Sequence, residues 1–300
     1  MPDEPETSRA AGTVSPAGAS DAVPMTRAQR RAQAAQADRA ARATQTLVLP
    51  PITSRRPLAV ASTIAFSALI ALTGYAHPVL VALAVALAGL VMAWGWPALL
   101  GLPSRFGTTV VLVIGALSCT LAAALSPDEP FLRWVPAALA VSLIAAFLHQ
   151  LLRRDGRPRL TESVAASGAG LAVIASGASY IPLPHTLGGP QTLAAAMAGL
   201  GLAALADLAV PTARLRAWAL PLAMLLGGLG GLLATLPAGR PQPATGALIG
   251  VLVAGTSHAT RRVLAVLPSM VSARSQLVSG AASVLLCGVV AYTLGRILVA

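Results

Sequence analysis

From residue 58 onward, long apolar runs alternate with short connections that are rich in Pro and Arg. A hydrocarbon core of about 30 Å requires roughly 20 helical residues for each crossing. The runs that meet this length lie at about residues 58–75, 79–96, 108–125, 134–152, 163–183, 192–210, 218–236, 244–260 and 276–299. The pattern therefore predicts an all-α fold, a polytopic transmembrane helix bundle of about nine spans.

Two residue types mark the ends of these spans. Pro stands in the connections near residues 77, 126, 183 and 240, where it favours turns. An indole ring prefers the lipid head-group layer, and all four tryptophans lie at predicted span ends. They are Trp94, Trp96, Trp134 and Trp218. Residues 261–274 fit less well, because this apolar stretch contains Pro268, and we expect either an interfacial helix or part of a shifted eighth span.

The first 57 residues form a separate basic tail in this prediction. Residues 1–24 are rich in Pro, Gly, Ser and acidic residues, so we expect them to be disordered. From Thr26 the residues are good helix formers, and Thr26 followed by Gln29 fits a capping box. This helix lacks an apolar stripe, so we expect its arginines to meet anionic head groups. The chain thus divides into a disordered to partly helical cytoplasmic tail (1–57) and a transmembrane domain (58–300).

Composition supports a membrane protein and excludes a water-soluble one. Hydrophobic residues make up 56% of the chain, charged residues only 10%, and the mean hydropathy is +0.74. Soluble domains carry about a quarter charged residues. A net charge of +11 would suggest nucleic acid in a soluble protein, but here the arginines stand beside apolar runs, where lipid and orientation account for them. We therefore expect no nucleic-acid partner.

Arginines in alternate connections predict the orientation. With the tail on one side, 18 of the 21 basic residues fall on that side, and only Arg133, Arg240 and Arg296 fall on the other. Cytoplasmic loops carry the excess of basic residues in membrane proteins. The sequence predicts a multi-pass plasma-membrane protein with a cytoplasmic N-terminus and an extracellular C-terminus.

Small residues recur at the spacing of close helix packing. Gly227 and Gly231 form one GxxxG pattern, and Gly246 and Gly250 form another in the next span. In lipid, this spacing lets two helix backbones approach closely. Packing within the bundle is the simplest interpretation, and a flexible helix that lines a cavity is the alternative.

Ionisable residues within spans are rare and often functional. His149, Asp207 and His258 each stand near the predicted cytoplasmic end of an even-numbered span, with arginines a few residues later. They predict a cytoplasmic-facing belt that binds an anionic head group or relays protons. The alternative is a snorkelling layer, in which Asp207 pairs with a nearby Arg and both histidines lie at the interface. The candidate binding residues are His149, Arg153, Arg154, Asp207, Arg214, His258, Arg261 and Arg262.

Catalytic motifs are absent from the sequence. It contains no GxxxxGK[ST] or Gly-rich nucleotide motif, no HExxH and no Cys cluster, which argues against ATP hydrolysis and zinc proteolysis. Cys119 and Cys287 lie alone in apolar runs, and we interpret them as packing residues. A membrane enzyme acting on lipid head groups ranks lowest, because closely spaced carboxylates for Mg²⁺ are scarce. We expect no catalytic residue, metal or cofactor.

Two segments resemble parts of uncharacterised multi-spanning membrane proteins of actinobacteria. They are AWGWPALLGLPSRFGTT (93–109) and FLHQLLRRDGRPRLTES (147–163). The resemblance extends from about residue 58 to the end of the chain. It implies a location in the cell membrane and no particular activity.

The sequence leaves two functions open. The first is a permease or lipid-handling protein without its own ATPase, with a cavity between the fourth and eighth spans that opens toward the predicted belt. The second is a non-catalytic scaffold that recruits envelope machinery through the basic tail. The expected partners are the bilayer, anionic head groups near the tail and loops, and either another membrane protein or a second copy of the chain.

Overall fold

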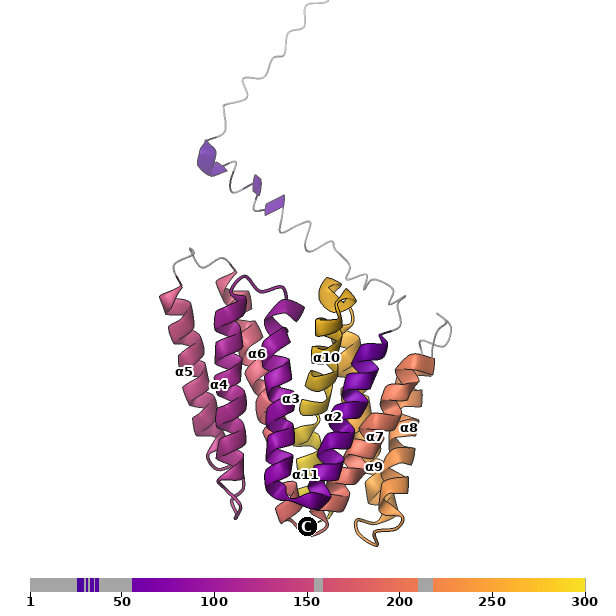
Figure 1. The fold of residues 1–300 in the computed structure, drawn as a ribbon. Helices are drawn as coiled ribbons and strands as arrows, with labels where there is room; N and C mark the ends of the chain where they lie inside the picture. The colour runs from indigo at the N-terminus through magenta and orange to yellow at the C-terminus, as the bar shows by residue number, and fades with distance from the viewer. Residues whose placement is uncertain are drawn as a thin grey trace, which may run out of the picture. The chain divides into compact units, whose positions relative to one another are not determined.

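The computed structural model describes residues 26–29, 31, 33–34, 36–37, 56–153, 159–209 and 218–299, and this part of the chain contains helices but no strand. The predicted all-α fold is therefore confirmed for these residues (Figure 1). The helices are α2 (Pro57–Ala76), α3 (Pro78–Leu99), α4 (Arg105–Ala124), α5 (Val135–Leu152), α6 (Leu160–Ala178), η1 (Leu183–His185), α7 (Gly189–Ala209), α8 (Ala219–Thr235), α9 (Pro243–Leu264), η3 (Pro268–Val271), α10 (Ala273–Leu285) and α11 (Gly288–Leu298).

Seven helical segments of the described part are long and apolar enough to cross a bilayer, so the chain is a membrane-embedded protein. They are α2, α3, α4, α5, α6 with η1, α7, and α10 with α11. Helix α8 has only 17 residues. Helix α9 has 22 residues but carries His258, Arg261 and Arg262 near its end, and it is not among the seven. Every predicted range overlaps a helix, but the count of nine spans is not confirmed.

Prolines determine where several helices begin. Pro57, Pro78 and Pro243 are the first residues of α2, α3 and α9, and Pro136 is the second residue of α5. Pro is tolerated there because the first N–H groups of a helix have no intrahelical acceptor, so the missing donor costs nothing. Of these, Pro78 and Pro243 belong to the connections in which the sequence predicted turns. Pro97 differs, since it lies within the last turn of α3.

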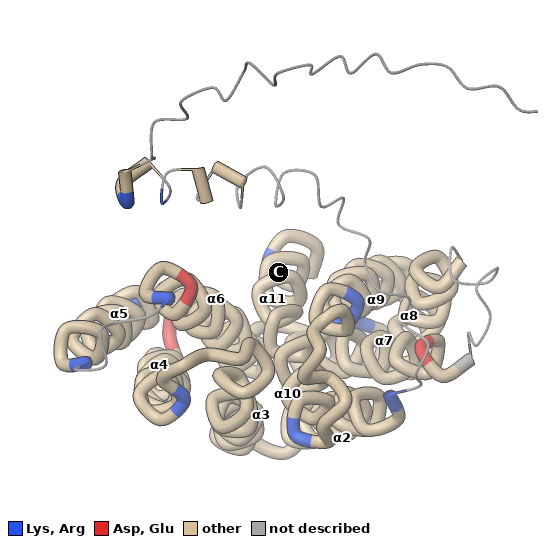
Figure 2. The backbone as a smooth tube through the Cα atoms, turned by 90° about the horizontal axis from the view of Figure 1, so that it is seen from above, with Lys and Arg blue, Asp and Glu red and all other residues tan. Residues whose placement is uncertain are grey.

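Two groups of helices pack on either side of α10 and α11 (Figure 2). The first lobe consists of α3, α4, α5 and α6, and the second lobe consists of α2, α7, α8 and α9. Helix α10 contacts α2 and α9 of the second lobe as well as α3 and α6 of the first. The segment formed by α10 and α11 therefore lies between the two lobes and touches both.

Arginines are unevenly divided between the two ends of the bundle. The near end is the end at which α2 begins, and the far end is the end at which α11 ends (Figure 1). Among the described residues of the bundle, the near end carries Arg56, Arg105, Arg153, Arg159, Arg261, Arg262 and Arg274. The far end carries Arg133, Arg240 and Arg296. The asymmetry counted from the sequence is thus present in the fold, whereas the side that faces the cytoplasm stays a prediction.

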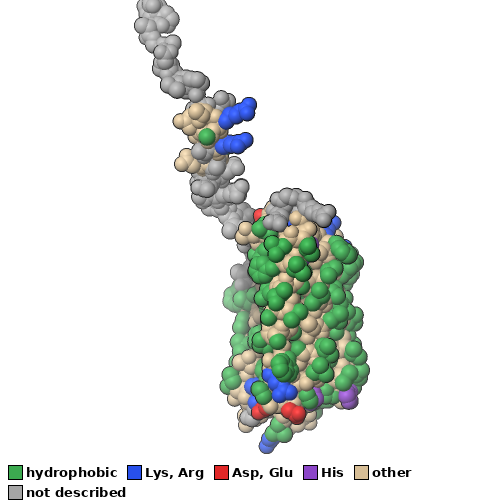
Figure 3. Space-filling model, turned by 90° about the vertical axis from the view of Figure 1, so that its left-hand side faces the viewer, with side chains coloured by type: hydrophobic (Ala, Val, Ile, Leu, Met, Phe, Trp, Pro, Cys, Tyr) green, Lys and Arg blue, Asp and Glu red, His purple; other side chains and the backbone are tan. Residues whose placement is uncertain are grey.

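The outer surface of the bundle is apolar along the helices (Figure 3). Large apolar side chains point outward from both lobes, with Leu152 of α5 at 70% and Leu225 of α8 at 71% exposure. Soluble monomers rarely expose contiguous apolar patches larger than a few hundred Å². A surface of this kind is suited to lipid.

The structure changes two expectations about the near end. Of the two alternatives for residues 261–274, the shifted eighth span is the nearer, because α9 continues through Arg261 to Leu264; the short 3-10 helix η3 covers Pro268–Val271, and α10 begins at Ala273. Trp96 does not face the outside of the bundle as a head-group contact requires but is buried, and its Nε1 donates to the carbonyl oxygen of Ala166 at 2.9 Å. Gly170 of α6 leaves room for the indole ring, since a Cβ there would lie only 3.0 Å from Trp96 Nε1.

The last predicted span is not one continuous helix. The apolar run predicts a single helix over residues 276–299, but α10 ends at Leu285 and α11 begins at Gly288. A Cβ at Gly288 would lie 1.9 Å from the carbonyl oxygen of Ser176, so α11 approaches the backbone of α6 directly. Close crossing with α6 therefore coincides with the break.

The tail contains the predicted capping box. The backbone N–H of Thr26 donates to Oε1 of Gln29 at 2.9 Å, and the backbone N–H of Gln29 donates to Oγ1 of Thr26 at 3.3 Å. The described residues between Arg27 and Ala37 are helical. The disorder expected for residues 1–24 concerns residues outside the described part.

Candidate functional site

A partly buried cluster of ionisable side chains joins α7 to α9 in the second lobe. Asp207 lies near the end of α7, and His258 and Arg261 lie three residues apart near the end of α9, which places both on one helix face. Arg261 Nε donates to Asp207 Oδ2 at 2.7 Å. His258 Nδ1 lies 2.8 Å from Asp207 Oδ1, an ion-pair distance without the geometry of a hydrogen bond. These three residues are named the Asp207 cluster.

The two α9 members of the Asp207 cluster lie inside the bundle. His258 is 3% exposed and Arg261 is 5% exposed. Long basic side chains near helix ends in membranes usually extend toward water. Helical side chains lean toward the N-terminus of their helix, and α9 begins at the far end, so Arg261 extends back into the bundle. The snorkelling interpretation correctly paired Asp207 with an arginine, but the arginine and His258 do not lie at the surface.

The Asp207 cluster continues into a chain of hydroxyl groups. Arg261 Nη1 donates to Ser257 Oγ and lies 3.4 Å from Ser283 Oγ of α10. The Ser283 oxygen is in turn 3.4 Å from Thr63 Oγ1 of α2, while each of these two hydroxyls donates its proton to a carbonyl of its own helix, that of Gly280 at 2.8 Å and that of Ala59 at 2.9 Å. Polar contacts therefore connect the charged pair to the segment between the lobes and to a further helix.

The Asp207–Arg261 pair is balanced in charge, but its hydrogen bonding is incomplete. Arg261 Nη2 is buried without a hydrogen-bond partner among the described residues. Removing one member of a buried ion pair commonly costs about 3–5 kcal/mol, whereas replacing both by apolar groups is often neutral. Stability alone therefore does not require a charged pair here.

The break between α10 and α11 lies near the middle of the 26-residue segment Ala273–Leu298. Ser176 of α6 contacts both sides of the break, since its Oγ donates to the carbonyl oxygen of Leu286 at 2.7 Å and accepts from the N–H of Val289 at 3.1 Å. The buried Tyr180 hydroxyl donates to the carbonyl oxygen of Val284 at 2.8 Å. Leu286 and Cys287 keep dihedral angles of the right-handed helical region, so the break is a short interruption of the helical hydrogen bonds, and Ser176 bonds backbone groups on both sides of it.

A thiol connects the break to the polar chain. Cys287, in the break itself, is fully buried, and its single S–H has two carbonyl oxygens within reach, that of Ser283 at 3.2 Å and that of Val253 at 3.3 Å. Ser283 thus contacts Arg261 through its side chain and Cys287 through its backbone. Cys287 is a packing residue as expected, and it also binds α10 to α9.

The structure does not bring His149 into the Asp207 cluster. His149 lies on α5 in the first lobe, where its Nε2 is 2.9 Å from Ser104 Oγ and its ring fills the space left by Gly107. Arg153 at the end of α5 donates to Gln150 Oε1 at 2.9 Å. The predicted belt is therefore divided between the two lobes. Arg262 is partly exposed, and Arg154 and Arg214 lie outside the described residues.

The four predicted packing glycines lie where α8 meets α9. A Cβ on Gly231 would be 2.0 Å from the carbonyl oxygen of Gly246, and a Cβ on Gly250 would be 2.1 Å from that of Gly227. Backbone atoms cannot move aside as a flexible side chain can, so the two helices touch backbone to backbone. The expected cavity does not open between these two faces. A pocket formed by described residues lies instead at the far end.

Sequence reasoning missed the hydroxyl groups of the polar chain, which belong to Thr63, Ser257 and Ser283, and it missed Tyr180 at the break. A signal was present in α10, where Ser275, Ser279 and Ser283 recur every four residues and are all buried. Such spacing places three hydroxyls on one helix face, which would have indicated a polar contact between helices.

The described residues contain no group of three or more His, Cys, Asp or Glu side chains arranged to hold a metal ion. No family model, curated protein or solved structure matches the chain. The resemblance to actinobacterial membrane proteins therefore gains no support, and any function has to be inferred from the site.

Proposed function

We propose that this chain is a plasma-membrane permease without its own ATPase, and that the Asp207 cluster is its polar site. The observation that carries the proposal is the Asp207–Arg261 pair, in which the arginine is buried and the carboxylate is 22% exposed, and which extends through Ser283 to a broken helix between two lobes. Ionisable groups within membrane spans are costly, and they commonly mark substrate or proton pathways. Packing alone would be served as well by apolar side chains.

The arrangement of helices supports alternating access. Secondary transporters often carry discontinuous helices near the bilayer midplane, and one group of helices rocks against another around them. Here Arg261 contacts the α10–α11 segment from the second lobe, and Ser176 and Tyr180 contact it from the first. An anionic group at Arg261 would compete with Asp207 for the guanidinium, and a proton on Asp207 would weaken the same pair. Either event changes the contact of α9 with α10.

The proposal includes nine crossings with the near end in the cytoplasm. Seventeen residues, the length of α8, is at the lower limit for a crossing. The charged residues that lower the hydropathy of α9 include His258 and Arg261, which face the bundle interior and not lipid. The arginine excess at the near end favours a cytoplasmic location for that end.

A deletion strain of the source organism separates a permease from a scaffold. Mass spectrometry would compare solutes and lipids in cells and medium after complementation with four chains. These are the native chain, Asp207→Asn/Arg261→Gln, Arg262→Gln, and a chain without residues 1–50. The double variant removes both buried charges together, so neither is left unpaired. Arg262→Gln is the matched control, because it removes a neighbouring charge outside the cluster.

The permease proposal predicts that at least one compound changes its distribution in the deletion strain. The native chain, Arg262→Gln and the truncated chain restore the distribution, and the double variant does not, although it is present in the membrane at the native amount. The scaffold hypothesis predicts the reverse: the double variant restores the native distribution, and the chain without residues 1–50 does not. That result, or restoration by all four chains, would refute the permease proposal.

A further inference from the structure

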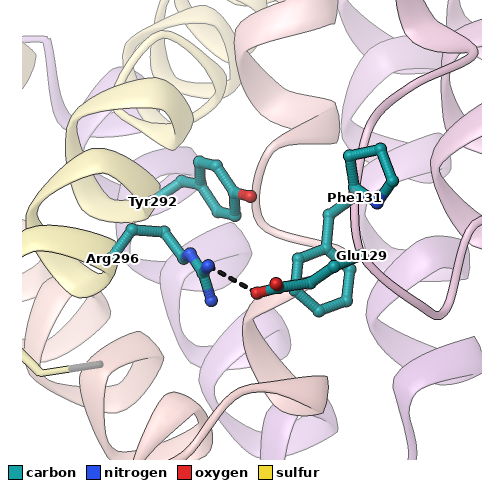
Figure 4. A pocket seen from close by; sticks show the side chains of 5 residues that line it. Glu129, Phe131, Tyr292 and Arg296 are labelled. Carbon is teal, nitrogen blue, oxygen red and sulfur yellow. Dashed lines mark hydrogen bonds and ion pairs between the residues drawn. The ribbon is translucent and has the colours of Figure 1, made fainter.

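A pocket of about 410 Å³ opens at the far end of the bundle, between the α4–α5 connection and α11 (Figure 4). Its lining residues are Glu129, Pro130, Phe131, Tyr292 and Arg296. Tyr292 and Arg296 are one helical turn apart on α11, so both face the connection. The pocket shares no residue with the Asp207 cluster, so a ligand bound here does not depend on the permease function.

The lining combines one cation, one anion and two aromatic rings. Arg296 Nη2 lies 2.5 Å from Glu129 Oε1, and the Arg296 guanidinium lies 5.6 Å from the centre of the Phe131 ring. The Arg296 side chain is 34% exposed and the Glu129 side chain is 62% exposed, so both charges remain accessible to solvent. An exposed pair of this kind contributes about 0–1 kcal/mol to stability. Its contribution to folding is therefore small.

The two charged groups have capacity for further hydrogen bonds. A guanidinium has five N–H donors, and a carboxylate accepts several hydrogen bonds, so their mutual contact uses only part of what each can form. An acidic group can bind Arg296 beside Glu129, and an amine can bind Glu129 and lie over an aromatic ring. Tyr292 directs its hydroxyl toward the same space (Figure 4). A ligand with one acidic group and one amine complements both charges, whereas a simple anion or cation would meet one like charge.

The surroundings place the pocket at a membrane surface. Ile297, next to Arg296, is 70% exposed. Trp134, three residues after Phe131, is also exposed, and the Arg133 guanidinium lies 5.8 Å from its ring centre. Exposed aromatic and basic residues of this kind are typical of the lipid head-group layer. The volume is within the range of about 300–1,000 Å³ found for small-molecule sites.

We propose that this pocket binds a zwitterionic group that carries an amine together with a phosphodiester or a carboxylate. The ethanolamine head group of a phospholipid and a free amino acid share this chemistry. In either case Arg296 binds the acidic group, Glu129 binds the amine, and Phe131 provides an apolar wall.

The test uses the full chain in nanodiscs of phosphatidylglycerol, titrated by calorimetry. Glycerophosphoethanolamine and glycine serve as zwitterionic probes, and glycerophosphoglycerol serves as a probe without an amine. We expect saturable binding of at least one zwitterion and none of glycerophosphoglycerol. A second arm identifies the source, since a lipid ligand predicts that ethanolamine lipid is enriched around the protein in mixed nanodiscs, and a free solute predicts binding without enrichment.

Variants distinguish the pocket from general surface charge. Arg296→Gln and Glu129→Gln should each weaken zwitterion binding at least tenfold. Arg133→Gln and Asp128→Asn make the same charge changes in the same connection without touching the lining, and they should stay within about twofold of the native chain. Three results would overturn the proposal. They are no binding of glycerophosphoethanolamine or of glycine to the native chain, native affinity in both Arg296→Gln and Glu129→Gln, and a loss of affinity in the two controls equal to that in the two pocket variants.

Discussion

At the scale of single residues, buried polar side chains hold helices together at a few specific points. Asp207 and Arg261 join α7 to α9, and Ser176 and Tyr180 bind α6 to the two sides of the α10–α11 break. Helices in lipid gain little from the hydrophobic effect when they associate, so close packing and hydrogen bonds carry more of the association energy. Each of these side chains therefore has a larger structural effect than its size suggests.

Ser176→Ala tests this effect at the break. The change leaves the carbonyl of Leu286 and the N–H of Val289 without the partner they have in the native chain. A buried group left unsatisfied costs about 1–3 kcal/mol, although interhelical hydrogen bonds in membranes average about 0.6 kcal/mol. We expect the free energy of unfolding, measured in detergent, to fall by about 1–2 kcal/mol.

Ser167→Ala is the control. Ser167 is a buried serine of α6 whose hydroxyl donates at 2.8 Å to a carbonyl of its own helix, so its removal should change the free energy of unfolding by less than about 0.5 kcal/mol. Equal effects of the two changes would contradict the assignment.

The sequence identified the charged residues of the site but not their grouping. Asp207 and His258 stood out because ionisable residues are rare in apolar runs, and Arg261 stood out with them as a neighbouring arginine. The depth of a residue along its span can be counted from the sequence, and this count placed His149 at the same depth as Asp207 and His258. The rotation of each helix about its axis and its neighbours in the bundle cannot be counted in this way. These two properties place His149 in the first lobe and Asp207 in the second.

At the scale of helices, glycines fix the closest contacts. Helices α8 and α9 touch through Gly227, Gly231, Gly246 and Gly250, and α11 approaches α6 at Gly288. The GxxxG spacing is visible in the sequence, so the contact between α8 and α9 could be predicted. The break before Gly288 could not be predicted, because residues 284–290 are apolar apart from Cys287 and Gly288 and contain no Pro. Gly288 permits the approach, and the contact with Ser176 of α6, which the sequence pattern does not reveal, lies at the point where that helix is interrupted.

Gly231→Ala tests the backbone contact of α8 with α9. The new Cβ would lie 2.0 Å from the carbonyl oxygen of Gly246, so the helices must separate. Overpacking of this kind costs about 1–3 kcal/mol. Gly168→Ala in α6 is the matched control, since a Cβ there meets nothing within 4 Å, and the higher helix propensity of Ala should stabilise the chain by up to about 1 kcal/mol. Thermal unfolding in one detergent should move in opposite directions for the two variants, and a shift in the same direction would be inconsistent with the packing described.

At the scale of the whole molecule, apolar surface and arginine placement together suit a bilayer. Apolar side chains cover the sides of the bundle, and the described arginines of the bundle gather at its two ends, with more of them at the near end. Two lobes enclose a broken segment that contacts both. The polar chain from Asp207 to Cys287 runs along this segment. Lipid-facing surface, segregated charge and an internal polar chain are the combination on which the permease proposal depends.

The most direct test of the proposed nine-crossing topology uses two single cysteines in a chain with Cys119→Ala and Cys287→Ser. Gln242→Cys lies between α8 and α9 at the far end, and Val271→Cys lies at the near end, where Val271 is 90% exposed. A membrane-impermeant maleimide should label Gln242→Cys in intact cells and Val271→Cys only after permeabilisation. Labelling of both positions only after permeabilisation would show that α8 and α9 do not cross the bilayer. Labelling of Val271→Cys alone in intact cells would show that the orientation is reversed.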